Sequence, residues 1–202
     1  MRTATLLALA AILPLAACDT YYDDDDDTFV RVIDFELDVD GYDVSGDGLT
    51  ASYDLDDIQS RADQDDVADA LRLAGDGALV LLYADNQLIL DVETTGQTYT
   101  ALPVTKGFEA VDEDGLPFVD YTVTFTYAFD NQDLYIDVLS SAELDFDVLF
   151  GDVLGVGNEI EFRLVTLEAD VVFSKQSEVA KTGRALDFRN YEEVKTVFGL
   201  PD

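Results

Sequence analysis

Strict alternation of apolar and polar side chains is the feature that most limits what this chain can fold into. Residues 121–129 show it best, because aromatic side chains and Val123 share one face of an extended segment while Thr122, Thr124 and Thr126 occupy the other. A period of two residues is typical of a half-buried β-strand. The same reasoning predicts further strands at 29–39, 49–53, 78–83, 88–92, 99–104, 134–138, 144–150 and 160–164. In the strand at 29–39 the apolar phase changes after Val32, which predicts a β-bulge.

Eight or nine short strands in one chain indicate an all-β fold. Two similar loops, 83–88 and 127–132, both contain Asp-Asn-Gln, which tolerates tight hairpins, so each is expected to join antiparallel neighbours. We therefore predict an antiparallel β-sandwich of immunoglobulin-like type, with a closed barrel as the alternative. One or two short peripheral helices are expected, at 63–73 and from Asn190 or Tyr191 to Phe198, the latter ending at Gly199.

We expect the sandwich to occupy residues 29–173 and a C-terminal segment with the short helix to occupy 174–202. The bases of the chain are unevenly spread, and this segment holds five of the eleven: Lys175, Lys181, Arg184, Arg189 and Lys195. Against an acidic body such a segment would dock within the molecule, and otherwise it would suit an acidic partner.

The net charge and the missing residue types exclude several functions. The chain carries a formal net charge of −33 and contains no histidine. Nucleic acid is excluded as a partner, because its binding depends on Lys and Arg displacing counterions from phosphates. Catalytic triads and imidazole metal sites need histidine, so no enzyme is expected. The abundance of Asp and scarcity of Lys resemble the surface of a salt-adapted, halophilic protein, in which ions screen the self-repulsion.

The first eighteen residues have the pattern of a targeting signal. Met1-Arg2 is followed by an apolar stretch that reaches Leu15-Ala16-Ala17-Cys18, which resembles the lipobox of bacterial lipoproteins. The stretch is too short to span a bilayer and fits a removed signal peptide at residues 1–17. The resemblance implies that Cys18 is lipidated and that the protein reaches its membrane partner through these acyl chains.

Residues 18–28 form the next segment, with five consecutive aspartates at 23–27. Like charges repel, so we predict a flexible acidic tether. An acidic run after the lipidated cysteine also resembles the surface-export signal of Bacteroidota lipoproteins, which favours the outer membrane or the cell surface. Asp19, in contrast, resembles an inner-membrane retention signal.

The whole layout resembles small uncharacterised envelope lipoproteins of Bacteroidota: a lipobox, an acidic tether, a strand-rich domain and a terminal segment at 191–200. This resemblance carries no activity. We therefore expect a non-catalytic interaction or accessory module in the cell envelope, with an envelope protein as its partner class.

Residues 43–54 suggest a second function. Their spacing resembles an EF-hand or dockerin-type calcium loop, which implies side-chain ligands at Asp43, Ser45, Asp47 and Asp54 and a carbonyl ligand at Leu49. Calcium is thus the one cofactor under consideration, in a calcium-dependent binding module. The alternative is a Gly-rich hairpin without metal. A carboxylate-dependent hydrolase is a third hypothesis, since 44 acidic residues offer many carboxylate pairs.

Overall fold

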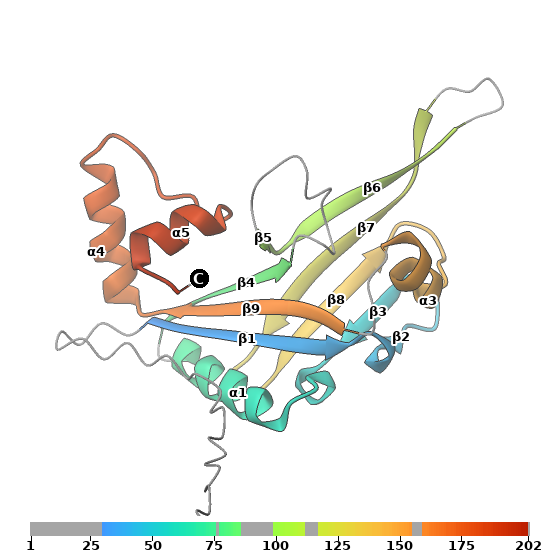
Figure 1. Ribbon diagram of the computed structural model, residues 1–202, viewed down its shortest axis with the longest axis horizontal. Coiled ribbons are helices and arrows are strands. Elements are labelled where there is room, and N and C mark those ends of the chain that lie inside the picture. Colours follow the sequence, from blue (N-terminus) through green and yellow to red (C-terminus); the bar gives the residue numbers. More distant parts are fainter. Residues whose placement is uncertain (1–29, 76, 86–98, 112–116, 155–158, 202) are drawn as a thin grey trace, which may run out of the picture.

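The computed structural model describes residues 30–75, 77–85, 99–111, 117–154 and 159–201, and these form two antiparallel β-sheets packed face to face (Figure 1). The prediction of an antiparallel β-sandwich with short helices is confirmed. Cys18, the signal peptide, the tether and the predicted strand at 88–92 lie outside the described residues.

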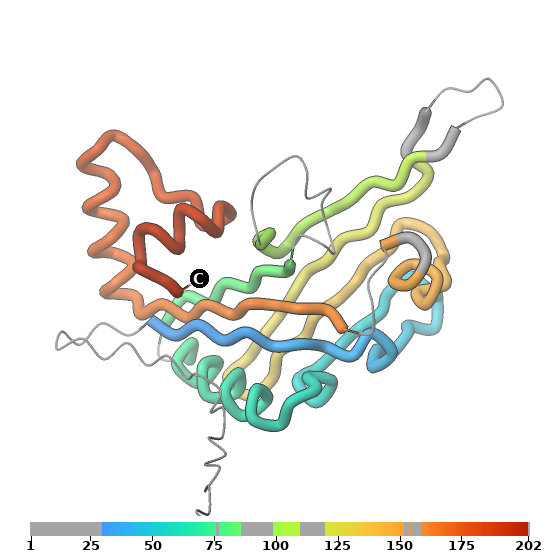
Figure 2. Tube along the Cα trace, viewed as in Figure 1, coloured from blue at the N-terminus to red at the C-terminus, as the bar shows by residue number. Residues whose placement is uncertain are grey.

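Sheet A consists of four strands in the order β1-β9-β4-β5. Its strands are β1 (Val30–Asp38), β9 (Glu159–Leu167), β4 (Leu79–Asp85) and β5 (Tyr99–Ala101). The first and ninth strands of the chain pair along their whole length, from Val30 opposite Leu167 to Asp38 opposite Glu159. Figure 2 shows these two segments, far apart in sequence, running side by side.

Sheet B consists of five strands in the order β2-β3-β8-β7-β6. Its strands are β2 (Asp43–Val44), β3 (Thr50–Tyr53), β8 (Leu134–Ser140), β7 (Pro117–Phe129) and β6 (Val104–Val111). A turn in which the Asp130 carboxylate accepts hydrogen bonds from the backbone N–H groups of Gln132 and Asp133 joins β7 to β8, as the loop pattern predicts. The expected strand at 99–104 is wrong as a single element, because the chain leaves sheet A after Ala101 and enters sheet B at Val104.

The main core lies between the sheets and is closed on one side by helix α1 (Arg61–Gly75). Phe35 of β1 and Phe162 of β9 stack there with ring centroids 5.7 Å apart. Val67, Ala70 and Leu71 of α1 are fully buried in the same core. The helix at 63–73 is therefore confirmed, but its expected role as a peripheral covering is wrong.

A second core lies on the other face of sheet A. Helices α4 (Ala169–Ala180) and α5 (Tyr191–Phe198) supply Val172, Tyr191 and Val194 to it, and Val165 and Leu167 of β9 meet them. The predicted helix at 191–198 is confirmed together with its caps: Asn190 accepts a hydrogen bond from the Glu193 N–H, and Gly199 adopts a φ of 68°. The C-terminal segment therefore docks on sheet A of the same molecule, as one of the two alternatives predicted.

This second core explains why the predicted bulge in β1 is wrong. The register between β1 and β9 runs without interruption. Val30 and Val32 face α4 and α5 while Ile33 and Phe35 face the main core, so the strand is apolar on both faces near its start. The change of apolar phase therefore marks a second layer. A register shift occurs instead in the β6–β7 hairpin, after Phe108.

The predicted strand at 144–150 is also wrong. Residues Phe146–Val148 form the short helix α3, which continues into a π-helical turn at Leu149–Val153. The Asp145 side chain accepts hydrogen bonds from the N–H groups of Asp147 and Val148, which starts the helix. Phe146, Leu149 and Phe150 are buried at helical spacing, whereas Val148, which a period of two places on the face of Phe146 and Phe150, is 46% exposed. The expected limit between the sandwich and the C-terminal segment, at 173 and 174, lies inside α4.

Candidate functional site

The calcium-loop residues lie in and around a β-hairpin between β2 and β3. In its turn, the Asp47 carboxylate accepts a hydrogen bond from the Ser45 hydroxyl (2.6 Å) and another from the Leu49 N–H (3.1 Å). Ser45 Oγ in turn accepts the Thr50 N–H at 3.0 Å, and Gly48 takes the positive φ of 68° that closes the turn. The hydrogen bond from Ser45, followed by the backbone bond from Leu49, lowers the pKa of Asp47. The Asp47 carboxylate therefore stabilises the turn by hydrogen bonds within it.

Asp43 and Asp54 lie away from that turn. Asp43 pairs with Ser52 across β2 and β3. Asp54 follows β3 and caps the 3-10 turn Leu55–Asp57: its side chain accepts the Asp56 N–H at 2.8 Å, while its own N–H donates to Asp57 at 2.8 Å. The strand β3 separates Asp54 from the turn by about 13 Å, at roughly 3.3 Å per residue.

The structure thus brings Ser45, Asp47 and Leu49 together but not Asp54. Within the described ranges, no group of three or more acidic or Cys side chains is placed to hold a metal ion. Residues 43–53 form a β-hairpin, which is the alternative that the sequence predicted. Calcium binding at this turn stays a prediction.

A buried cation on sheet A is the polar site that sequence reasoning missed. Arg163 of β9 is only 4% exposed, and Asp34 of β1 lies directly opposite it. Arg163 Nε donates to Asp34 Oδ1 at 2.5 Å and Nη2 donates to Oδ2 at 2.6 Å, a bidentate pair. Nη1 donates to the Tyr191 hydroxyl of α5. The guanidinium carbon lies 4.6 Å from the centre of the Tyr99 ring and 5.4 Å from that of Tyr191.

The partners of Arg163 keep it charged inside the protein. Burial alone lowers the pKa of Arg163, but the hydrogen bonds and charge of Asp34 and the contact with Tyr191 outweigh it and raise the pKa above its ordinary value. Tyr83 and Tyr99 both meet the Tyr191 ring edge-on at 5.1 Å. The cluster therefore fastens helix α5 to sheet A. One signal was available in the sequence: Val165 and Leu167 continue the face of Arg163, so that face could not be wholly solvated.

Beyond Arg163 the same face of sheet A becomes acidic and exposed. Glu36 of β1 lies opposite Glu161 of β9, and Glu159 is its neighbour. Burial raises the pKa of Glu36, and repulsion from Glu159 and Glu161 raises it further. Paired carboxylates of this kind are what a hydrolase would require, but all three side chains are exposed on open strands.

A row of hydroxyl groups covers part of the outer face of sheet B. Thr105 and Thr124 share a hydrogen bond of 2.8 Å, and the Ser52 hydroxyl donates to Asp137 at 2.7 Å. Between them on β8, Tyr135 is 41% exposed and Leu139 is 40% exposed. This face is less charged than the acidic face of sheet A.

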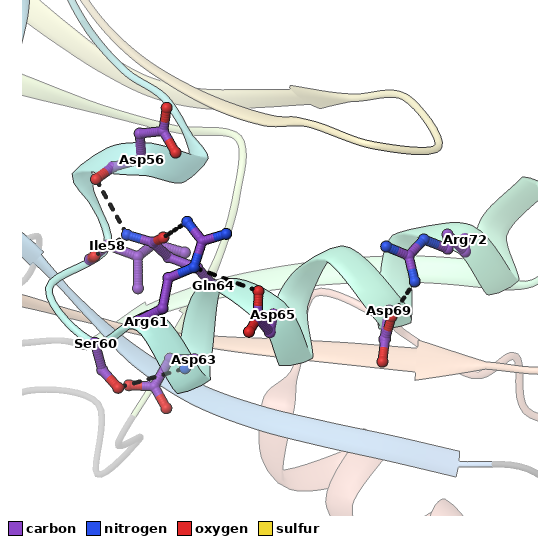
Figure 3. A network of polar contacts seen from close by, with 9 residues as sticks. All are labelled: Asp56, Ile58, Ser60, Arg61, Asp63, Gln64, Asp65, Asp69 and Arg72. Carbon is purple, nitrogen blue, oxygen red and sulfur yellow. Dashed lines mark hydrogen bonds and ion pairs between the residues drawn. The ribbon is translucent and has the colours of Figure 1, made fainter.

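Helix α1 carries a separate polar network at its exposed side (Figure 3). Gln64 donates to the carbonyl oxygens of Ile58 (2.7 Å) and Asp56 (3.2 Å) and accepts from Arg61 at 2.8 Å. Arg72 pairs with Asp69 one turn away. These contacts stay within the helix and the turn before it, so they stabilise the local structure.

No known protein family, curated protein or solved structure matches this chain. Every helix that the structure describes falls short of the length and apolar character required of a membrane-spanning segment.

Proposed function

We propose that this chain is a lipid-anchored cell-envelope protein, held by acyl chains on Cys18, and that its β-sandwich serves as a non-catalytic interaction module. The observation that carries the proposal is the sequence Leu15-Ala16-Ala17-Cys18 after a short apolar stretch. Both hydrophobic cores are built from residues after the tether, which supports a folded unit that begins where the tether ends. Each buried methylene contributes about 0.8 kcal/mol, so two or more acyl chains hold a protein on a membrane for long periods.

The non-catalytic role is supported by what the described carboxylates do. Asp47 closes a hairpin turn, Asp54 caps a helical turn, and Asp145 starts α3. Glu36 and its neighbours are exposed on open strands. An envelope protein is the partner class we propose, at the outer membrane or the cell surface.

Lipidation is tested by expressing the full precursor in a bacterial host fed with an alkyne-bearing fatty acid. We expect the parent chain to take up the label and to sediment with membranes, because Cys18 carries the acyl chains. The Cys18→Ala variant should lose both properties, while the neighbouring Thr20→Ala variant should keep them. An unlabelled parent chain, or label that persists in Cys18→Ala, would contradict the proposal.

A further inference from the structure

The tether enters the sandwich beside helix α4. Val30, the first residue of β1, lies opposite Leu167, the last residue of β9, and α4 starts at Ala169. In Figure 1 the start of β1 and the lower end of α4 lie at the same end of sheet A. Residues 18–29 span about 40 Å at full extension, at no more than roughly 3.5 Å per residue. An anchor at Cys18 therefore keeps α4 within this distance of the bilayer.

Helix α4 has an exposed face with an aromatic side chain on it. Only Val171 and Val172 of the helix are buried, whereas Phe173 is 69% exposed, more than any other large hydrophobic residue that the structure describes as exposed. Gln176, Ser177 and Ala180 are exposed on the same side, at positions i+3, i+4 and i+7 from Phe173. Asp170, one turn before Phe173, is an exposed acidic residue on this side, and the three positions that follow Phe173 on it carry none.

The charge of this region differs from that of the rest of the chain. Half of the ten bases that follow residue 17 fall within 174–198, together with four acids. Lys175 pairs with Glu178 and Arg184 with Glu193. Lys181, at the end of α4, is exposed and makes no ion pair with a described residue. A basic side chain near an anionic lipid surface contributes about 1 kcal/mol, whereas the acidic remainder is repelled.

We propose that the end of the sandwich that carries α4 lies against the bilayer holding the anchor, with Phe173 in the interface and Lys181 at the lipid headgroups. The inference rests on the proposed lipid anchor at Cys18. At a membrane interface, Phe and Trp side chains lie at the boundary between headgroups and acyl chains, and basic side chains lie at the headgroups. The hairpin between β2 and β3 lies on the side of the molecule opposite to α4 (Figure 1). In this orientation it points away from the membrane.

The chain contains no tryptophan, so one introduced Trp reports on its own surroundings. The lipidated full-length Phe173→Trp variant is reconstituted on vesicles of phosphatidylcholine and phosphatidylglycerol, with and without brominated acyl chains. We expect its emission to move to shorter wavelength on the vesicles and to be quenched by the brominated lipid. Tyr135→Trp, on the outer face of sheet B, is the matched control and should show neither effect.

The outcomes separate the two proposals. A chain that does not float with the vesicles refutes the lipid anchor, and this orientation with it. A chain that floats while the emission of the Phe173→Trp variant responds no more than that of the Tyr135→Trp control refutes the orientation alone.

The charge argument has its own variant. Adding Lys181→Glu to Phe173→Trp should weaken the quenching, because an acid then meets the anionic headgroups. Arg61→Glu, at an exposed position of α1, should leave the quenching unchanged. Equal quenching in the presence and absence of Lys181→Glu would remove Lys181 from the proposed contact.

Discussion

Removing the Tyr191 hydroxyl tests whether Arg163 depends on α5. Tyr191 is 1% exposed, and its hydroxyl accepts the Nη1 donor of Arg163, itself 4% exposed. Tyr191→Phe keeps the ring contacts with Tyr83 and Tyr99 but removes the hydroxyl that accepts the hydrogen bond from Nη1. A hydrogen bond to a charged group contributes about 1.5–3 kcal/mol, and we expect the free energy of unfolding to fall by this amount. Tyr191→Ala also removes the ring, and a buried aromatic residue replaced by Ala costs about 3–5 kcal/mol.

The assay is urea-induced unfolding at high NaCl, followed by far-ultraviolet circular dichroism. Tyr135→Phe is the matched control, because Tyr135 is 41% exposed, and it should change stability by no more than about 0.5 kcal/mol. If Tyr191→Phe is as stable as the parent chain, Arg163 finds another partner for Nη1, and the cluster does not fasten α5 to sheet A through this bond. A smaller loss for Tyr191→Ala than for Tyr191→Phe would refute the packing argument as well.

Three further predictions follow from single contacts. Because burial and then Glu159 and Glu161 raise the pKa of Glu36, the stabilisation from its protonation is complete below the ordinary pKa of 4.5 and is lost as the pH rises through the raised value. Glu36→Gln should therefore melt at a higher temperature than the parent at pH 7 and at nearly the same temperature near pH 4; a constant difference between the two would contradict this. Asp47→Ala should lower the melting temperature in EDTA, because the Asp47 carboxylate accepts hydrogen bonds from Ser45 and Leu49, and an unchanged melting temperature would contradict this; a rise with millimolar calcium that the parent shows and the variant loses would support the calcium loop. Asn190→Ala removes the N-cap of α5 and should destabilise the protein by about 1 kcal/mol, with faster amide exchange at Glu193 as the local readout and unchanged exchange there as the contrary result.

Local signals were enough to predict much of the fold. Alternation found the strands at 121–129 and 160–164, because side chains two residues apart share a face wherever a strand has one buried side. The two ends of α5 could also be predicted from the sequence. Asn190 and Gly199 form hydrogen bonds with backbone groups of the helix only three or four residues away. Such contacts lie within the same short segment, so the segment alone specifies them.

The errors share a different cause. At 144–150 the apolar residues fit a period of two, yet Phe146, Leu149 and Phe150 equally fit a helix, and the Asp145 cap decided between them. A long-range arrangement also sets the distance between two of the predicted calcium ligands, because β3 stands between Asp47 and Asp54. Helix α4 was not predicted, since only two of its residues are buried and its apolar pattern is weak.

Local patterns and composition were sufficient to predict the strand pattern, the antiparallel sandwich, the capped C-terminal helix and the net charge of −33, because each depends on neighbouring residues or on composition. Long-range contacts were needed to show that α4 and α5 cover part of the second face of sheet A and that Arg163 lies between Asp34 and Tyr191. These residues are separated by 129 and 28 positions along the chain, so no local pattern relates them. They meet because β9 pairs with β1 and because α5 folds back on the same sheet, where an arginine can be buried only with such partners.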